Sequence, residues 1–206
     1  MSFEGIKGKV GEYYSGRVRE HGSSARGVDW NSEESQVLRF TQLARVLPDT
    51  GRFSVVDFGC GYGALVPFLK ARGSDFDYQG FDISDEMIKR AGQDLGGDRL
   101  RFTASEAELE PADYTLASGI FNVRLDTSVE DWTKYVLHTT AILDRLGERG
   151  FAFNMLTSYS DADRMRSDLY YGDPSFFFDH CKRTYSKQVA LLHDYGLYEF
   201  TVLVRK

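Results

Sequence analysis

The stretch VVDFGCGYGAL at residues 55–65 constrains the fold of this chain most strongly. An apolar run ends at the acid Asp57, and Gly59, Gly61 and Gly63 then stand at alternate positions before a second apolar run begins. Glycine tolerates positive φ and carries no side chain, so a turn of this kind lets a ligand approach the backbone closely. The stretch therefore predicts a strand, a tight turn and a helix, with a ligand lying against the turn.

A second apolar run, YQGFDISDEMI at residues 78–88, ends in Asp82. Its distance from the turn is about the 20 residues at which nucleotide-binding α/β proteins place an acid on a ribose hydroxyl. Two of the glycines and Ala64 also satisfy the dinucleotide pattern GxGxxG/A, so an NAD-dependent oxidoreductase is one interpretation. Against it, Asp57 would repel a pyrophosphate, and Gly63 falls outside that spacing. A cationic or zwitterionic ligand fits the turn better.

Strand-like and helical patterns alternate along most of the chain. Ser32 followed by two acids predicts the start of a helix that ends by Pro48. The elements expected after it are strand 53–58, helix 64–72, strand 77–82, helix 85–95, strand 99–104, strand 112–118, helix 128–146 and strand 150–156. Two β-rich runs around Tyr195 and Gly196 indicate a closing antiparallel hairpin. This alternation favours right-handed βαβ crossovers and a mainly parallel sheet.

Length and composition predict a single domain over residues 1–206, since 206 residues with 42% hydrophobic side chains can bury one substantial core. Within it, residues 1–48 form N-terminal helices and a cap segment, and the aromatic-rich insertion at 157–186 is a candidate lid. A net charge of −6 argues against a broad nucleic-acid surface. No apolar run approaches the about 18 residues of a membrane span, so we expect a cytoplasmic protein without membrane contact.

VVDFGCGYGAL resembles motif I of the class I S-adenosylmethionine-dependent methyltransferases, and YQGFDIS resembles their acidic second motif. The likeness spans about residues 33–156 and the terminal hairpin. It implies an α/β fold, a Rossmann-like three-layer sandwich whose seven-stranded, mostly parallel sheet has one antiparallel strand in the C-terminal hairpin. It also implies S-adenosylmethionine as cofactor. SGIFN at 118–122 replaces the NPPY-like tetrapeptide of relatives that methylate nucleobases or glutamine amides, which disfavours those acceptors.

The resemblance also implies roles for matching residues. Asp57 would hold the methionine-ammonium side of the cofactor, the three glycines would let the backbone pass beneath it, and Asp82 would accept from both ribose hydroxyls. Ile83 would pack on adenine and Glu106 would accept from its amino group, although the family usually has aspartate there. Ser118, at the end of the fourth strand, would line the channel for methyl transfer.

Three residues before the core are further candidates for the cofactor site. If the N-terminal segment folds over the cofactor, Tyr14 and Trp30 would exclude water, and Gln36 could reach the carboxylate end of the cofactor. The alternative is that the aromatic side chains only anchor the N-terminal helix on the sheet.

Candidate acceptor and catalytic residues lie elsewhere in the chain. Asn122 and Arg124 follow the fourth strand, where open α/β sheets bind ligands, and Arg124 would suit an acidic or hydroxylated substrate. His21 and His180 are candidate general bases by their location, and each has an alternative as a surface or structural residue. No metal site is predicted.

The sequence thus predicts a methyltransferase that transfers a methyl group to an oxygen or nitrogen of a small-molecule acceptor. The alternatives are the NAD-dependent oxidoreductase and a non-catalytic module that binds S-adenosylmethionine without turnover. A protein or RNA acceptor also stays open, because the acidic net charge is an average over the chain. A homodimer is not excluded.

Overall fold

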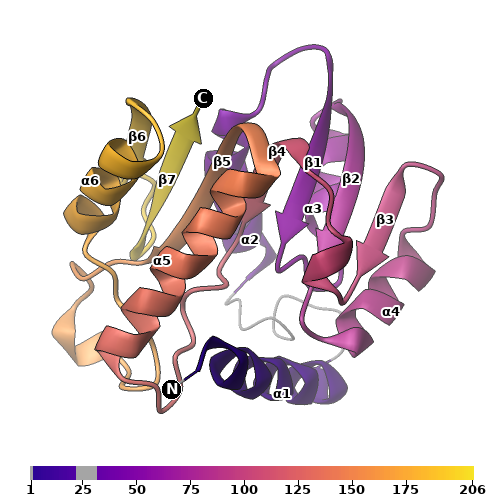
Figure 1. The fold of residues 1–206 in the computed structure, drawn as a ribbon. Helices are drawn as coiled ribbons and strands as arrows, with labels where there is room; N and C mark the ends of the chain where they lie inside the picture. The colour runs from indigo at the N-terminus through magenta and orange to yellow at the C-terminus, as the bar shows by residue number, and fades with distance from the viewer. Residues whose placement is uncertain (1, 22–31) are drawn as a thin grey trace.

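The computed structural model describes residues 2–21 and 32–206, and it describes side chains for residues 2–16 and 32–206. Seven strands form one sheet in the order β3-β2-β1-β4-β5-β7-β6 (Figure 1). The strands are β1 (Arg52–Phe58), β2 (Asp75–Phe81), β3 (Leu100–Thr103), β4 (Ala112–Ala117), β5 (Gly147–Leu156), β6 (Gln188–Leu192) and β7 (Glu199–Arg205). Only β7 runs against its neighbours, because it pairs antiparallel with both β5 and β6. The predicted sheet, with one antiparallel strand in the C-terminal hairpin, is confirmed.

Helices cover both faces of the sheet and complete the three layers (Figure 1). One face packs against α5 (Val129–Leu146) and α6 (Pro174–Thr184), and the other packs against α2 (Glu33–Leu43), α3 (Leu65–Ala71) and α4 (Asp85–Asp94). Alternate residues of a strand point to opposite faces, so Val56 belongs to the first core and Val55 to the second. The central strands therefore consist almost entirely of buried residues.

Helix α1 (Phe3–His21) lies apart from these layers, beneath the ends at which β1, β2 and β3 finish (Figure 1). Its apolar side chains Ile6 and Val10 are buried and join the core cluster that contains Phe58 and Phe81, the last residues of β1 and β2. The N-terminal segment is thus anchored on the sheet, and it also covers the edge at which an α/β sheet binds its ligands.

Most predicted boundaries agree with the structure within about two residues, and one expectation needs correction. The side chain of Ser128 caps α5 by accepting from the Asp131 N–H. Residues 174–184, predicted as part of a lid, instead form α6, whose Phe177 and Cys181 are fully buried. Among the described residues, no helix combines the length and apolar character that a membrane crossing needs.

Candidate active site

A cavity opens between helix α1 and the carboxyl ends of β1, β2 and β4. Its lining joins residues that lie far apart in the sequence and come from α1, α2, the turn after β1, the end of β2 and the segment after β4: Val10, Tyr14, Gln36, Phe40, Asp57, Phe58, Gly59, Cys60, Gly61, Tyr62, Ala64, Phe81, Asp82, Ile83, Met87, Ser118, Gly119, Ile120 and Tyr135. We call it the cofactor cavity. It brings together most of the residues predicted to bind the cofactor.

Asp57 provides a buried carboxyl group in this cavity, since its side chain is only 3% exposed. It lies at the end of the central strand β1, opposite Gly80 of β2 and Leu116 of β4. Burial raises the pKa of Asp57 to about 7, although the hydroxyl of Tyr78 donates a 2.7 Å hydrogen bond to Oδ2 and opposes the shift. A positive charge beside Asp57 would favour the ionised carboxylate, so the cavity favours a cationic ligand group.

Asp82 follows β2 and orders the glycine turn. Its Oδ2 accepts from the Gly61 N–H at 2.9 Å, and its Oδ1 accepts from the Ser84 N–H at 2.9 Å. Burial raises the pKa of Asp82 above its usual value. Each carboxylate oxygen keeps a further lone pair, so the group can still accept from two ligand hydroxyls.

The amides of the turn are already used inside the protein. The N–H groups of Gly59 and Cys60 both donate to the carbonyl of Phe81, at 2.7 and 2.8 Å, and the Gly61 N–H donates to Asp82. A loop that binds diphosphate needs such amides to point at the phosphate oxygens. The turn therefore presents carboxylates rather than amide donors, which disfavours the pyrophosphate of NAD.

Close packing explains why the turn needs glycine. Gly59 has φ +84°, and a Cβ there would lie 2.2 Å from Cγ2 of Ile120. Gly63 has φ +83°, and a Cβ there would lie 2.5 Å from Cδ1 of Leu95. Both positions are strained and obstructed for any other residue.

Ser118 supplies a second kind of evidence that the cavity is built for a polar ligand. Its Oγ is buried, and no hydrogen-bond partner for it occurs within the described part of the chain. A buried hydroxyl without a partner costs free energy, and a ligand can offset that cost. The cofactor cavity thus offers two desolvated carboxyl groups, the Ser118 hydroxyl and a lining that is otherwise mainly apolar. This combination fits a ligand with an ammonium group, a sulfonium and a ribose.

The remaining predicted cofactor residues fall into three groups. Tyr14, Gln36 and Ile83 line the cofactor cavity, and the Gln36 side chain accepts from the hydroxyl of Tyr62 at 3.2 Å. Glu106 instead lines an adjoining open cavity together with Ile83, and its Oε2 accepts from Lys7 Nζ at 2.8 Å. Trp30 lies outside the described residues, and so does the side chain of His21, which was predicted as a general base and not as a cofactor residue.

A second cavity adjoins the first, and we call it the acceptor cavity. It is lined by residues of α1, α2, the segment after β4, the segment after β5 and the start of β7: Tyr14, Arg39, Gly119, Asn122, Val123, Leu156, Ser160, Arg164, Arg166, Leu169, Tyr171, Tyr198 and Glu199. Tyr14 and Gly119 belong to both cavities. A ligand in either cavity therefore comes close to the same tyrosine and the same stretch of backbone.

The two predicted acceptor residues have different environments. Asn122 lines the acceptor cavity, and its Oδ1 accepts from the Leu156 N–H at 3.0 Å. Arg124 is not among the described lining residues. Its guanidinium donates to the carbonyls of Thr127, Ser167 and Leu169. Arg124 thus holds the segment that follows β5, and the geometry does not support direct substrate binding by this side chain.

His180 also lies away from both cavities. It belongs to α6, which Figure 1 places at the left, away from α1 and from the carboxyl ends of β1, β2 and β4. Its ring stacks with Phe176, and its Nε2 lies 3.4 Å from the Tyr185 hydroxyl. Burial lowers the pKa of His180. These contacts support the structural alternative for this residue.

Sequence reasoning missed a buried ion pair at the back of the acceptor cavity. Arg39 Nε donates to Glu199 Oε2 at 2.7 Å, and Asn154 Nδ2 donates to the same oxygen at 3.2 Å. Asn154 Oδ1 in turn accepts from the Gly119 N–H at 2.7 Å. The ion pair therefore fixes the backbone that borders both cavities. Arg39 follows Gln36 by one helical turn, but no local pattern predicts its partner 160 residues away.

Fold and cavity together define the class of protein. A mostly parallel sheet with an antiparallel seventh strand, a glycine turn after β1 and acids at the ends of β1 and β2 are the features of a class I S-adenosylmethionine-dependent methyltransferase. Comparisons with known proteins agree. A family model described as "Methyltransferase domain" matches residues 55–143.

A Mycobacterium tuberculosis protein named "Putative methyltransferase Rv1506c" is 52% identical over 163 residues, which cover 79% of this chain and 98% of that protein. The chain therefore belongs to the methyltransferase family, and S-adenosylmethionine is its cofactor.

Solved structures share the fold at low identity. Magnesium protoporphyrin IX methyltransferase from Synechocystis PCC 6803 with bound SAM has a TM-score of 0.62 and 16% identity, over 98% of this chain and 97% of that chain. The structure titled "DhpI-SAM-HEP complex" has a TM-score of 0.67 and 15% identity, over all of both chains. These likenesses concern the fold. The family shown by the Mycobacterium tuberculosis relative and the carboxylates beside the turn favour the predicted cofactor over NAD, and we do not pursue the oxidoreductase interpretation.

Proposed function

We propose that this protein transfers the methyl group of S-adenosylmethionine to an oxygen or nitrogen atom of a small molecule bound in the acceptor cavity. The observation that carries the proposal is that the two cavities meet at Tyr14 and Gly119. A reaction between two bound molecules needs such a shared boundary, because the methyl group must pass directly from one to the other.

Different lining residues would hold different parts of the cofactor. Asp57 would pair with its ammonium group, directly or through water, and Asp82 would accept from the ribose hydroxyls with its remaining lone pairs. Ile83 would pack against adenine, while Glu106 would reach the amino group of adenine only by sharing its carboxylate with Lys7. The bound cofactor supplies an activated methyl group on a sulfonium.

Positioning accounts for most of what the protein must contribute. Methyl transfer is an in-line displacement, which is accelerated by holding the nucleophile at near-attack distance in a site without water. Tyr14, Gly119 and the buried Arg39–Glu199 pair form a rigid wall for this purpose. No histidine occurs among the described residues that line either cavity. An acceptor whose nucleophile is already deprotonated would need no base.

A turnover assay tests this proposal. The protein is incubated with S-adenosylmethionine and a panel of small phenols, hydroxy acids and amines, and S-adenosylhomocysteine release is measured. We expect release with at least one acceptor and binding of S-adenosylhomocysteine in calorimetry. Binding without turnover on small, protein and RNA acceptors would support the non-catalytic alternative. Turnover on protein or RNA alone would refute the small-molecule proposal.

A further inference from the structure

The acceptor cavity is unusual in its charge. Among the residues that the structure describes, its lining contains three cationic side chains, Arg39, Arg164 and Arg166, and one acidic side chain, Glu199. The chain as a whole carries a net charge of −6. The charged side chains among these lining residues are therefore mainly cationic, and a cationic group in the wall of a cavity favours a ligand of negative charge.

Two of the three arginines are compensated inside the protein. Arg39 forms the buried ion pair with Glu199, and their side chains are only 8% and 2% exposed. Arg166 donates to both oxygens of Asp168, through Nε at 3.1 Å and Nη2 at 2.5 Å. These pairs contribute little net charge to the cavity.

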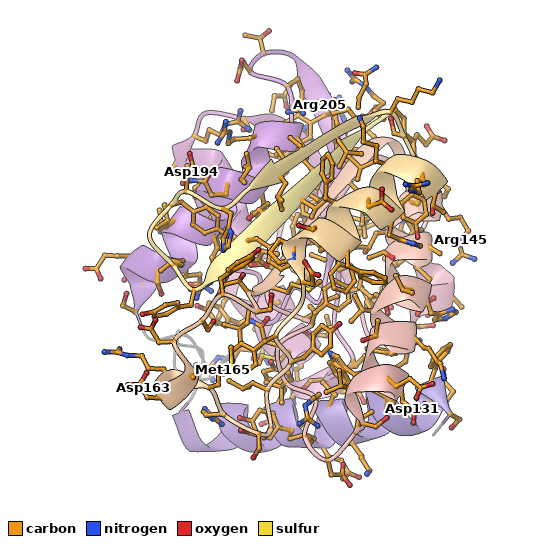
Figure 2. All side chains as sticks on the ribbon, turned by 90° about the vertical axis from the view of Figure 1, so that its left-hand side faces the viewer. Asp131, Arg145, Asp163, Met165, Asp194 and Arg205 are labelled. Carbon is orange, nitrogen blue, oxygen red and sulfur yellow. The ribbon has the colours of Figure 1, made fainter. Side chains whose placement is uncertain are left out.

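Arg164 is the lining cation that forms no ion pair with another described residue, so we assign it to a ligand. It lies on the short helix η4 (Ala162–Arg164), which Figure 2 shows through its labelled neighbours Asp163 and Met165 at the lower left, on the level of α1. Two acids, Asp161 and Asp163, lie near enough to act on the Tyr198 hydroxyl together with Arg164, and Asp161 accepts from that hydroxyl. Neither acid is among the described lining residues of the cavity.

The rest of the cavity suits a small organic acid. Val123, Leu156 and Leu169 provide apolar wall. The Tyr171 oxygen accepts from the Arg166 N–H at 2.9 Å, so its own hydroxyl proton is free to point toward a ligand. Arg124 holds the backbone of residues 167–169 through its contacts with the carbonyls of Ser167 and Leu169, which keeps this wall in place.

We propose that the acceptor is a small carboxylic acid whose carboxylate pairs with Arg164 while its nucleophilic atom lies near Tyr14 and Gly119. This proposal rests on the proposed function and names its substrate class. The guanidinium of Arg164 matches the single charge of a carboxylate, and it can bind the two oxygens side by side. A phosphate monoester carries more charge than this lining compensates.

Matched pairs of compounds test the proposal. The probes are 4-hydroxybenzoate with 4-hydroxybenzamide, and 4-aminobenzoate with 4-aminobenzamide, which differ only in the charged group. Each is titrated by ligand-observed NMR into the full chain saturated with S-adenosylhomocysteine. We expect each carboxylate to bind about tenfold or more tightly than its amide. Arg164→Gln should remove that preference while leaving the affinity for S-adenosylhomocysteine unchanged.

Arg183→Gln is the matched control, since Arg183 is an exposed arginine on α6 that pairs with Asp179 away from the cavities. It should keep the full preference for the carboxylates. The proposal is overturned if neither carboxylate binds more tightly than its amide, including the case in which none of the four binds, or if Arg164→Gln keeps the preference. Carboxylate binding that depends on Arg164 without any turnover would refute the proposed function and leave the carboxylate site standing.

Discussion

The cofactor cavity and the acceptor cavity differ in how the chain builds them. The polar groups of the cofactor cavity come mainly from residues 57–63 and 82, on two neighbouring strands and one turn. The charged groups of the acceptor cavity come from α2, from η4 and the residues just after it, and from β7, which are brought together only when the sheet is complete. The cofactor cavity is thus built locally on the central strands, whereas the acceptor cavity depends on the whole fold. We therefore expect substitutions in the two cavities to have different effects.

The largest expected effect is a loss of stability in the wall of the acceptor cavity. Glu199→Ala leaves the buried Arg39 charge without its carboxylate, and removing one partner of a buried ion pair costs about 3–5 kcal/mol of the free energy of unfolding. Urea denaturation measures the loss. The double variant Arg39→Met with Glu199→Leu removes both charges and should recover most of it. A single variant that loses under about 1 kcal/mol would contradict this assignment.

The next effect is a gain in the free energy of unfolding, and it concerns the cofactor cavity. The pKa of Asp57 is about 7 in the folded state and 3.8 in the unfolded state. Between these two pH values the folded state keeps a proton on Asp57 that the unfolded state has lost. The contribution of Asp57 to stability therefore falls as the pH rises from about 4 to 7. Asp57→Asn keeps an acceptor for Tyr78 and should be more stable than the wild type by about 3–4 kcal/mol at pH 8, with a smaller gain at pH 5.

The same substitution should weaken cofactor binding, since the ammonium group loses its carboxylate. Calorimetry with S-adenosylhomocysteine should also show that wild-type affinity falls as the pH drops below about 7, and that Asp57→Asn flattens this dependence. A variant that is less stable than the wild type at pH 8, or that binds equally well, would refute the predicted role of Asp57.

A third prediction tests whether Asp82 binds the ribose hydroxyls in addition to holding the glycine turn. Asp82→Ala should lower the affinity for S-adenosylhomocysteine about 100-fold, because two hydrogen bonds to a charged acceptor are lost. Asp82 also holds the Gly61 and Ser84 amides, so far-ultraviolet circular dichroism must show that the variant is folded. Asp94→Ala, on an exposed carboxylate at the end of α4, is the control and should bind normally. Unchanged affinity in a folded Asp82→Ala protein would remove the ribose assignment.

The two cavities also differ in how far the sequence predicts them. The acids and glycines around β1 and β2 follow from a short pattern, because a strand, turn and helix are set by neighbouring residues. Arg124 could not be interpreted correctly in this way, since two of its three carbonyl partners lie more than 40 residues further along the chain. A cation after a strand looks the same in sequence whether it holds a loop or a substrate.

Helix α6 is a different kind of error, because the sequence does contain its signal. Asp173 caps the helix through the Ser175 and Phe176 amides, and Pro174 follows at the first position. Phe177 and Cys181 then stand four residues apart on the buried face. The dense aromatic composition of 157–186 suggested one lid, whereas the cap divides this stretch into a loop beside the acceptor cavity and a core helix.

The smallest predicted difference tests whether the glycine turn is set by backbone conformation or by packing. Gly59 and Gly73 both have positive φ, at +84° and +78°, but a Cβ at Gly73 meets nothing within 4 Å, whereas one at Gly59 would meet Ile120. Gly73→Ala should therefore cost only the conformational strain, about 1 kcal/mol. Gly59→Ala should cost about 2 kcal/mol more, because Ile120 must move. Urea denaturation measures both. Equal losses would mean that Ile120 yields easily, and packing would then not explain why residue 59 is glycine.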